Sequence, residues 1–346
     1  METGCPITWR SVGESKKLIC MKDYLKLVRL PNLVIIALVQ LAIFFLVITP
    51  VSNVAGVPTD KVFPDSLLVC LILATVFTAA GGYAINDYFD VKIDEINHPL
   101  THLVGRSISK HSTMTVFIVC SILGAVLGAV IGLYAWMKLN APFSVAFTYV
   151  LLFLIIAGIL WFYSSSYKRI FVLGNLFASA LNALVPMLVV VCYNFFLSMK
   201  YGTNPEIVDF SRYLLAIVAV FAVCVFLWTF VAEVAIDFEE EKGDRELECH
   251  SFPIVLGHTP ARVIMFAAII LVNLFCAHVV FRMLPFDPMF SLRYYFCAVL
   301  APSIAISFLL VKANTRQDYK NVSLVAYVIM LLSVAYSIVF YMSYDS

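Results

Sequence analysis

The chain has 346 residues, of which 62% are hydrophobic and 13% are charged, and its formal net charge is +1. Soluble globular domains have far fewer apolar residues, so this composition excludes an ordinary soluble protein. A membrane-spanning helix needs roughly 20 mostly apolar residues, and nine stretches approach that length. They cover residues 31–50, 66–86, 112–135, 143–163, 172–197, 212–235, 261–282, 293–311 and 322–343. We therefore expect an all-α fold, a nine-transmembrane-helix bundle.

The region before the first span is charged and lacks the small-residue cleavage site of a secretory signal. Its stretch from Lys16 to Arg29 predicts an amphipathic segment that leads into the first helix. We expect two regions: a cytoplasmic N-terminal lead-in over residues 1–30 and a single transmembrane domain over residues 31–343.

The first acidic cluster follows the second span and reads Asn-Asp-Tyr-Phe-Asp-Val-Lys-Ile-Asp over residues 86–94. Carboxylates beside a hydrocarbon core are costly, so a cluster of them there is a candidate functional site. If the helix continues past the membrane surface, Asn86, Asp90 and Asp94 lie on one face, because they are four residues apart.

The second acidic cluster follows the sixth span. Its carboxylates at positions i, i+4, i+7, i+8 and i+11 of a helix are Glu233, Asp237, Glu240, Glu241 and Asp244. Like charges four residues apart repel each other unless a cation lies between them. Two such clusters facing one cavity suit Mg²⁺, which proteins hold with a few carboxylates, waters and substrate phosphates. The alternative is a solvated acidic loop at the membrane surface.

Basic residues accompany the clusters. Lys168 lies in the connection 164–171, which is short enough for an antiparallel helical hairpin, and Arg29 precedes the first helix. Arg106 and Arg245 follow the two acidic clusters. Arg and Lys pair with phosphate oxygens, which suits a diphosphate substrate. The alternative is that these residues only anchor the cytoplasmic ends of the helices.

The distribution of basic residues predicts the orientation. If nine helices alternate, 17 of the 23 Lys and Arg residues fall on the side of the N-terminus. The positive-inside rule then places the N-terminus in the cytoplasm and the C-terminus outside. Both acidic clusters follow even-numbered spans, so both reach the cytoplasmic side. We expect an integral, multi-pass protein of a bacterial or archaeal plasma membrane.

These motifs resemble those of a known family. The N-D-Y-F-D-x-x-x-D motif of residues 86–94, followed by Asn-His-Pro-Leu at 97–100, resembles the first aspartate-rich motif of the UbiA superfamily of intramembrane prenyltransferases. The segment 237–245, with Ser-Phe-Pro-Ile-Val-Leu-Gly at 251–257, resembles the second. Tyr163 to Lys168 with Gly174-Asn175 resembles a third segment, and Arg29-x-Pro31-Asn32 resembles the start of helix one.

The resemblance spans nearly the whole chain, and the second motif is most similar to archaeal-type geranylgeranylglyceryl phosphate geranylgeranyltransferases. The chain departs from the family pattern at several positions. His98 stands where Arg or Lys is usual, Glu240 where Asp is common, and Ser251 where Thr is common. The Pro-Ser/Thr-Gly that often follows the first motif is replaced by Thr101-His102-Leu103. These changes leave the expected metal chemistry in place and bear on the identity of the acceptor.

The resemblance implies Mg²⁺-dependent transfer of a polyisoprenyl group from an isoprenyl diphosphate to geranylgeranylglyceryl phosphate, in a central cavity open to the cytoplasmic side. The implied metal ligands are Asn86, Asp90 and Asp94 for one ion and Asp237, Glu240 and Asp244 for a second. The implied catalytic residues are Asp90, Asp94, Asp237, Asp244 and Lys168. The implied substrate-binding residues are Asn86, Arg29, Asn32, Tyr163, Arg106 and Arg245. The rings proposed to stabilise an allylic cation are Tyr83, Tyr88, Phe162 and Tyr163.

Other functions remain open at this point. The same chemistry could prenylate an aromatic quinone precursor of the hydroxybenzoate or naphthoate type. A membrane phosphatase could use the same metals, and a cation transporter would place its carboxylates near the bilayer midplane. The expected partners are the isoprenyl diphosphate, a small lipid-like or aromatic acceptor and membrane lipids, with no nucleic acid.

Overall fold

The computed structural model describes residues 21–283 and 288–344, and in this part of the chain the regular structure is helical, with one isolated β-bridge and no strand. Nine of its helices are long and apolar enough to cross a membrane. The predicted all-α, nine-span bundle is therefore confirmed. Most of the predicted N-terminal lead-in, residues 1–20, lies outside the described residues, and the two-region division stays a prediction.

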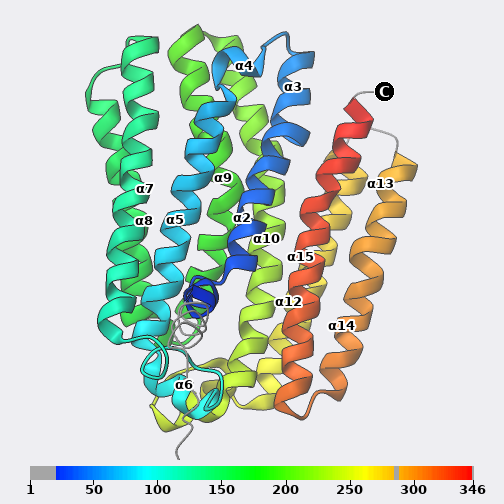
Figure 1. Cartoon of the computed structure of the whole chain (residues 1–346). Helices are drawn as coiled ribbons and strands as arrows, with labels where there is room; N and C mark the ends of the chain where they lie inside the picture. The colour runs from blue at the N-terminus through cyan, green and yellow to red at the C-terminus, as the bar shows by residue number, and fades with distance from the viewer. Residues whose placement is uncertain (1–20, 284–287, 345–346) are drawn as a thin grey trace, which may run out of the picture.

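The spans follow the predicted order (Figure 1). They are α2, η1 and α3 (Leu30–Ala42, Ile43–Ile48 and Thr49–Val54), α5 (Asp65–Phe89), α7 (Lys110–Leu139), α8 (Ser144–Ser165), α9 (Leu173–Tyr201), α10 (Pro205–Glu246), α12 with η3 (His258–His278, Val279–Met283), α13, η4 and α14 (Pro288–Tyr294, Tyr295–Leu300, Ala301–Lys312) and α15 (Arg316–Tyr344). Short helices connect them: α4 (Thr59–Val62), α6 (Val91–Asn97), η2 (Tyr167–Arg169) and α11 (Phe252–Leu256).

Helix α10 is the centre of the bundle and packs along both α9 and α15. On one side α5, α7 and α8 form a layer, and small residues allow these helices to approach closely. A Cβ atom at Gly124 would collide with Thr78, and one at Gly132 would collide with the backbone of Ala146. Helices α8 and α9 follow each other antiparallel, but α8 packs on α5 and α7 whereas α9 packs on α10.

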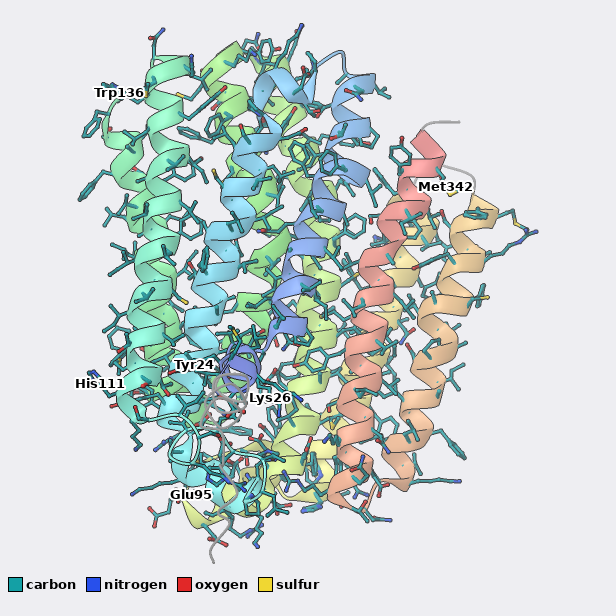
Figure 2. The ribbon with its side chains drawn as sticks, in the orientation of Figure 1. Tyr24, Lys26, Glu95, His111, Trp136 and Met342 are labelled. Carbon is teal, nitrogen blue, oxygen red and sulfur yellow. The ribbon has the colours of Figure 1, made fainter. Side chains whose placement is uncertain are left out.

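The two acidic clusters lie at the same end of the bundle, the lower end in Figure 1, where α6 and the start of α2 are found. Figure 2 places Lys26, Glu95 and His111 at this end and Trp136 and Met342 toward the other. We call the end with α6 the acidic end. The sequence prediction that both clusters share one side is confirmed, while the side of the membrane that this end faces stays a prediction.

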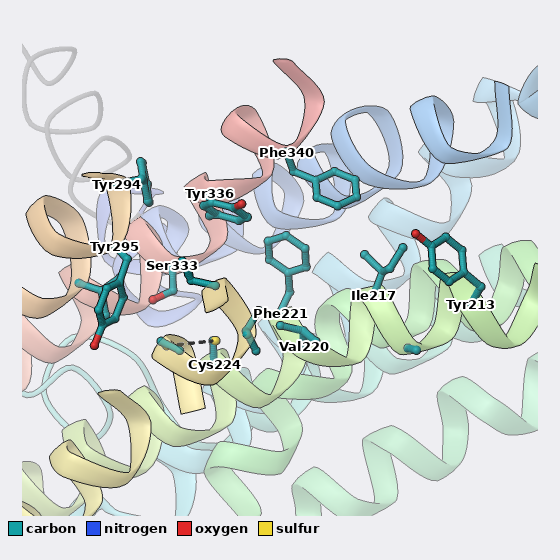
Figure 3. Close-up of a pocket in the computed structure, with 15 residues that line it drawn as sticks. Tyr213, Ile217, Val220, Phe221, Cys224, Tyr294, Tyr295, Ser333, Tyr336 and Phe340 are labelled. Atoms are coloured by element: carbon teal, nitrogen blue, oxygen red, sulfur yellow. Dashed lines mark hydrogen bonds between the residues drawn. The ribbon is translucent and has the colours of Figure 1, made fainter. Parts of the chain in front are cut away.

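An apolar cavity of about 270 Å³ lies in the other half of the bundle, between α10, α12, η4 and α15. Figure 3 shows its aromatic lining, including Tyr295, Tyr336 and Phe340. Cys224 Sγ and Cys276 Sγ approach to 3.8 Å in its wall. Along α10, the fully buried Trp228 lies between Cys224 in the cavity wall and the acidic cluster. This apolar cavity is therefore distinct from the central cavity that the resemblance implies. The central cavity stays a prediction.

Candidate active site

Asp90 marks a break between α5 and α6. Helix α5 ends at Phe89, and Asp90 has φ −88° and ψ 2° before α6 starts at Val91. The condition of one continuous helix through residues 86–94, on which the shared face of Asn86, Asp90 and Asp94 depended, is therefore not met. The apolar run ends here, and Asp is a weak helix former that bonds readily to other groups. The first cluster nevertheless stays together, because Asn86 Nδ2 donates to Asp90 Oδ2 (2.9 Å) and the Asp94 amide donates to the Asp90 carbonyl (2.8 Å).

Lys168 contacts the first cluster from the connection between α8 and α9. Its Nζ donates to Asp90 Oδ2 at 2.5 Å, and Asp90 is buried. Burial alone would lower the pKa of Lys168, but the carboxylates of Asp90 and Glu240 outweigh it and raise the pKa well above its usual value. Lys168 is therefore a permanent cation at this site.

The connection that carries Lys168 has an unusual backbone. Val172 has a φ of 65°, a conformation that is costly for a β-branched residue. A Cβ atom at Gly174 would lie 2.7 Å from the Lys168 carbonyl oxygen, so a glycine is needed for this approach. The amide of His250 donates to the Arg169 carbonyl (3.1 Å), which ties the connection to the segment after α10.

The second cluster lies on α10, which continues without a break to Glu246. Because α10 is unbroken, Glu233, Asp237, Glu240 and Asp244 lie on one face, as their spacing predicts. Asp237 Oδ2 accepts hydrogen bonds from Asn175 Nδ2 and from the Phe252 amide, both 3.2 Å.

Glu241 differs from the other carboxylates of α10, because it pairs with basic side chains outside the cluster. The Arg245 guanidinium lies 2.6 Å from Glu241 Oε1, and His258 Nε2 lies 2.9 Å from Glu241 Oε2. These pairs direct the Glu241 carboxylate toward Arg245 and His258. The predicted substrate contact of Arg245, whose side chain is 64% exposed, stays a prediction.

Asn97 joins the two clusters. Its Nδ2 donates to the Glu240 carbonyl (3.1 Å), and its Oδ1 accepts from the Gly243 amide (3.1 Å). A Cβ atom at Gly243 would lie 2.5 Å from Asn97 Nδ2, so the contact requires a glycine. Sequence reasoning gave Asn97 no role. The available signal was a glycine near the end of a long helix, which indicates a close approach by another group.

Arg316 of α15 reaches the same place. Its Nη2 lies 3.3 Å from both ring nitrogens of His98 and 3.8 Å from Glu239 Oε1, and its Nη1 donates to the Asn97 carbonyl. His98 Nε2 lies 3.9 Å from Glu240 Oε1. A guanidinium therefore stands beside the position where the family resemblance expects Arg or Lys. Sequence reasoning missed this residue.

The start of the first helix also meets the first cluster. Arg29 Nη2 lies 3.2 Å from Asp87 Oδ1, and the guanidinium carbon lies 5.0 Å from the centre of the Tyr83 ring. Asn32 interacts with Tyr83, while Tyr163 is within electrostatic reach of Lys168. Arg29, Asn32 and Tyr163 are thus brought to the clusters as the sequence predicts, and their roles toward a substrate stay predictions.

Arg106 is placed elsewhere. It is exposed and donates to the Leu100 carbonyl, within the loop that follows α6. This contact closes the loop and does not direct the guanidinium to either acidic cluster. Its predicted contact with substrate stays a prediction.

The donor set suits a hard cation such as Mg²⁺. No group of three His, Cys, Asp or Glu side chains among residues 21–283 and 288–344 forms a complete metal site. Mg²⁺, however, is usually bound by one or two carboxylates and completed by water and phosphate. Burial and the neighbouring carboxylates of Asp90 and Asp87 raise the pKa of Asp94 to about 6. Burial raises the pKa of the Asp244 carboxyl, and the Ser251 hydroxyl, which is buried beside that carboxylate, has a smaller, lowering effect. Carboxylates crowded this closely fit a site that receives a cation.

Comparison with known proteins decides the family. The model of the UbiA prenyltransferase family matches residues 45–330. The chain belongs to the UbiA prenyltransferase family. The match covers both acidic clusters and Lys168, and the resemblance seen in the motifs is confirmed.

Curated relatives of this family member are archaeal proteins named digeranylgeranylglyceryl phosphate synthase. The protein of Pyrococcus furiosus is 26% identical over 202 residues, which is 58% of this chain and 61% of the relative. That of Ignicoccus hospitalis is 27% identical over 308 residues, 86% of this chain and 83% of the relative. The chain thus spans about three-fifths of the length of the Pyrococcus relative and most of the Ignicoccus relative.

Solved structures share the fold. A digeranylgeranylglyceryl phosphate synthase superposes with a TM-score of 0.55 at 19% identity, covering 92% of this chain and 99% of that one. A UbiA homologue from Archaeoglobus fulgidus, solved with GPP and Mg²⁺ bound, superposes with a TM-score of 0.52 at 14% identity, with the same coverage.

Proposed function

We propose that this protein transfers a polyisoprenyl group from an isoprenyl diphosphate to a lipid precursor, and that the precursor is geranylgeranylglyceryl phosphate. The family membership supports prenyl transfer, and the names of the archaeal relatives support the acceptor. The Archaeoglobus homologue with bound GPP and Mg²⁺ supports the donor class and the metal.

The observation that carries the proposal is the meeting of both acidic clusters around one lysine. Lys168 contacts Asp90 at 2.5 Å, and Asn97 holds α6 against the Glu240 turn of α10. A diphosphate is a dense anion that binds where cations are held between carboxylates. When the diphosphate binds beside Asp90, Lys168 is placed to donate a hydrogen bond to one of its phosphate oxygens.

We assign Asn86, Asp90 and Asp94 to one Mg²⁺ ion and Asp237, Glu240 and Asp244 to a second. Bound Mg²⁺ would supply Lewis-acid stabilisation of the negative charge that builds on the diphosphate as the C–O bond breaks. The apolar helices above the clusters would then keep water away from the allylic carbon. The reaction would face the cytoplasm, because 17 of the 23 basic residues are on the side of the N-terminus.

Aromatic quinone precursors are the alternative acceptors. Transfer to them would use the same donor and metal site and differ only in the group that attacks the allylic carbon. The departures at His98, Glu240 and Ser251 lie at the acidic end, where His98 approaches Glu240 and Ser251 approaches Asp244. A panel of acceptors distinguishes the two classes.

The test is incubation of the purified protein with radiolabelled geranylgeranyl diphosphate, Mg²⁺ and a panel of acceptors. We expect a labelled lipid product with geranylgeranylglyceryl phosphate and none with hydroxybenzoate or naphthoate. A product with an aromatic acceptor alone would replace the proposed acceptor. Absence of transfer to every acceptor would refute the prenyltransferase proposal. In the same assay, Asp90→Ala and Asp244→Ala should each lower turnover by about 10²-fold or more, and Glu239→Ala should have a much smaller effect.

A further inference from the structure

Glu233 is a carboxylate that the proposed metal and diphosphate chemistry does not use. It precedes Asp237 by four residues on α10, which places it about 6 Å deeper in the bundle. Its neighbours Ala232 and Val234 are fully buried, and Glu233 itself is half-buried. A carboxylate this far from the membrane surface is costly to keep and is by default a candidate for function.

One oxygen of Glu233 is held and the other is free. The Tyr327 hydroxyl of α15 donates to Glu233 Oε1 at 2.9 Å. Within residues 21–283 and 288–344, Oε2 accepts no hydrogen bond and the carboxylate forms no ion pair at contact distance. Among the described residues, Oε2 is not one of the completely enclosed polar atoms without a partner, so another group can reach it. The carboxylate is therefore fixed by Tyr327 and keeps one oxygen for another group.

The groups around Glu233 come from four helices, from the α8–α9 connection and from the residue before α2. They are Arg29 before α2, Tyr83 of α5, Tyr163 of α8, Lys168 of the α8–α9 connection, Asp237 and Glu240 of α10, and Tyr327 of α15. Along the unbroken helix α10, Glu233 thus lies deeper in the bundle than the proposed Mg²⁺ ligands Asp237, Glu240 and Asp244. The apolar part of a prenyl donor would extend past it into the bundle.

We propose that Glu233 accepts the proton of the acceptor hydroxyl during prenyl transfer, and that Tyr327 is the positioning residue that holds its carboxylate. This inference rests on the proposed function. The bond between the allylic carbon and the diphosphate oxygen breaks, and its electron pair leaves with the diphosphate. An electron pair of the acceptor hydroxyl forms the new C–O bond, and the hydroxyl proton passes to Glu233 Oε2 and later to water.

Two other carboxylates at the site already accept hydrogen bonds from neighbouring groups. Asp90 is bound by Asn86 and Lys168, and Asp237 is bound by Asn175 and the Phe252 amide. A general base must lie within hydrogen-bond reach of the proton that it removes. Glu233 lies on the apolar side of the diphosphate ligands, where the reacting carbon and the attacking hydroxyl would meet.

The test separates donor ionisation from proton removal. Geranylgeranyl diphosphate labelled with ¹⁸O at the bridging oxygen exchanges that label with non-bridging oxygens when the C–O bond breaks and re-forms. This exchange needs no base. We expect Glu233→Gln to lower product formation by about 10²- to 10⁴-fold, the usual contribution of general acid–base catalysis, while oxygen exchange stays within about threefold of the unaltered protein.

Two further variants complete the test. Tyr327→Phe keeps the carboxylate but frees it to rotate, so it should lower product formation about tenfold, as expected for lost orientation, without changing oxygen exchange. Glu233→Asp takes the place of Glu233→Gln if the amide variant does not fold, and it should lower product formation with exchange kept. Glu206→Gln, at the exposed opposite end of α10, is the control and should change neither reading.

The outcomes are distinct. Unchanged product formation in Glu233→Gln, or equal loss of exchange and product formation in a folded variant, overturns the assignment of Glu233 as the base. If the unaltered protein shows neither oxygen exchange nor product formation, the proposed function itself is overturned, and this inference falls with it. Loss of product with exchange retained supports both.

Discussion

The Asn97 side chain forms two hydrogen bonds with the backbone of α10 beside Gly243. It donates to the Glu240 carbonyl and accepts from the Gly243 amide, both at 3.1 Å. This contact links α6 to α10 across 143 residues of sequence. It fixes the distance between the carboxylates that follow α5 and those at the end of α10. Changes at either residue therefore test whether the two clusters act together.

Gly243→Ala should disrupt this link. The added methyl group would lie 2.5 Å from Asn97 Nδ2, and overpacking of this kind costs about 1–3 kcal/mol. We expect a lower melting temperature in detergent and a loss of prenyl transfer, measured on the same preparation. Gly158→Ala on α8 is the matched control, because a Cβ atom there meets nothing within 4 Å. That control should be neutral or stabilising by up to about 1 kcal/mol; equal behaviour of the two variants would contradict the proposed close contact.

Arg316 is expected to supply the positive charge that the usual Arg or Lys at position 98 would give. Arg316→Gln should raise the KM for the diphosphate donor about tenfold, roughly the effect of one charge-assisted hydrogen bond, with a smaller change in kcat. Adding His98→Arg to that variant should restore much of the donor affinity, because Arg316 lies 3.3 Å from His98. Arg212→Gln, in an exposed pair at the other end of α10, is the control. An unchanged KM in Arg316→Gln would remove Arg316 from the donor site.

Mg²⁺ binding should weaken at low pH. Burial and the Asp90 and Asp87 carboxylates raise the pKa of Asp94 to about 6 in the metal-free protein. As the pH falls through 6, Asp94 takes up a proton that Mg²⁺ must displace, so the apparent affinity for Mg²⁺ should drop. Titration of donor binding with Mg²⁺ at several pH values between about 5 and 8 measures this effect, and Asp94→Asn should flatten the dependence. A dependence that is unchanged in Asp94→Asn would assign the effect to another group.

The same shift has a consequence for stability without metal. Because the folded pKa of Asp94 lies above the ordinary Asp value of 3.8, the folded protein binds more protons than the unfolded chain between these pH values. The contribution of Asp94 to the free energy of unfolding should then decrease as the pH rises through that window. Thermal unfolding in chelator at about pH 4.5 and about pH 7, with Asp94→Asn for comparison, measures this contribution.

The orientation in the membrane can be tested by labelling. Glu95→Cys at the acidic end and Lys138→Cys at the opposite end introduce thiols at exposed positions. With the 17-to-6 division of basic residues, an impermeant maleimide should reach the thiol of the Glu95→Cys variant only from the cytoplasmic side. It should reach the thiol of the Lys138→Cys variant only from outside. Native Cys249 is a poor probe, because it is 5% exposed. Labelling of both variants from one side would contradict the nine-span topology.

The sequence predicted the spans well because the length of an apolar run decides whether a helix can cross a membrane. It also placed both clusters at one end, since both follow even-numbered spans, and it predicted the shared face of the α10 carboxylates because α10 is regular. It failed at Asp90, where the helix breaks. There the Asp90 carboxylate is bound by Lys168, 78 residues away, and no local pattern reveals that contact. Arg316 was missed for the same reason, since its partner His98 is 218 residues earlier in the chain.

The most direct test of the central claim measures donor binding without turnover. The thiolo analogue of geranylgeranyl diphosphate, whose C–S bond resists ionisation, can be titrated calorimetrically into the purified protein with Mg²⁺ or with chelator. If both acidic clusters hold the diphosphate through Mg²⁺ with Lys168 beside Asp90, binding should be strong only with Mg²⁺. It should then weaken by about 10²-fold in Asp90→Asn and in Asp244→Asn alike, as expected when a buried charged contact is lost. Equal affinity in chelator, or loss in one variant without the other, would contradict a shared site.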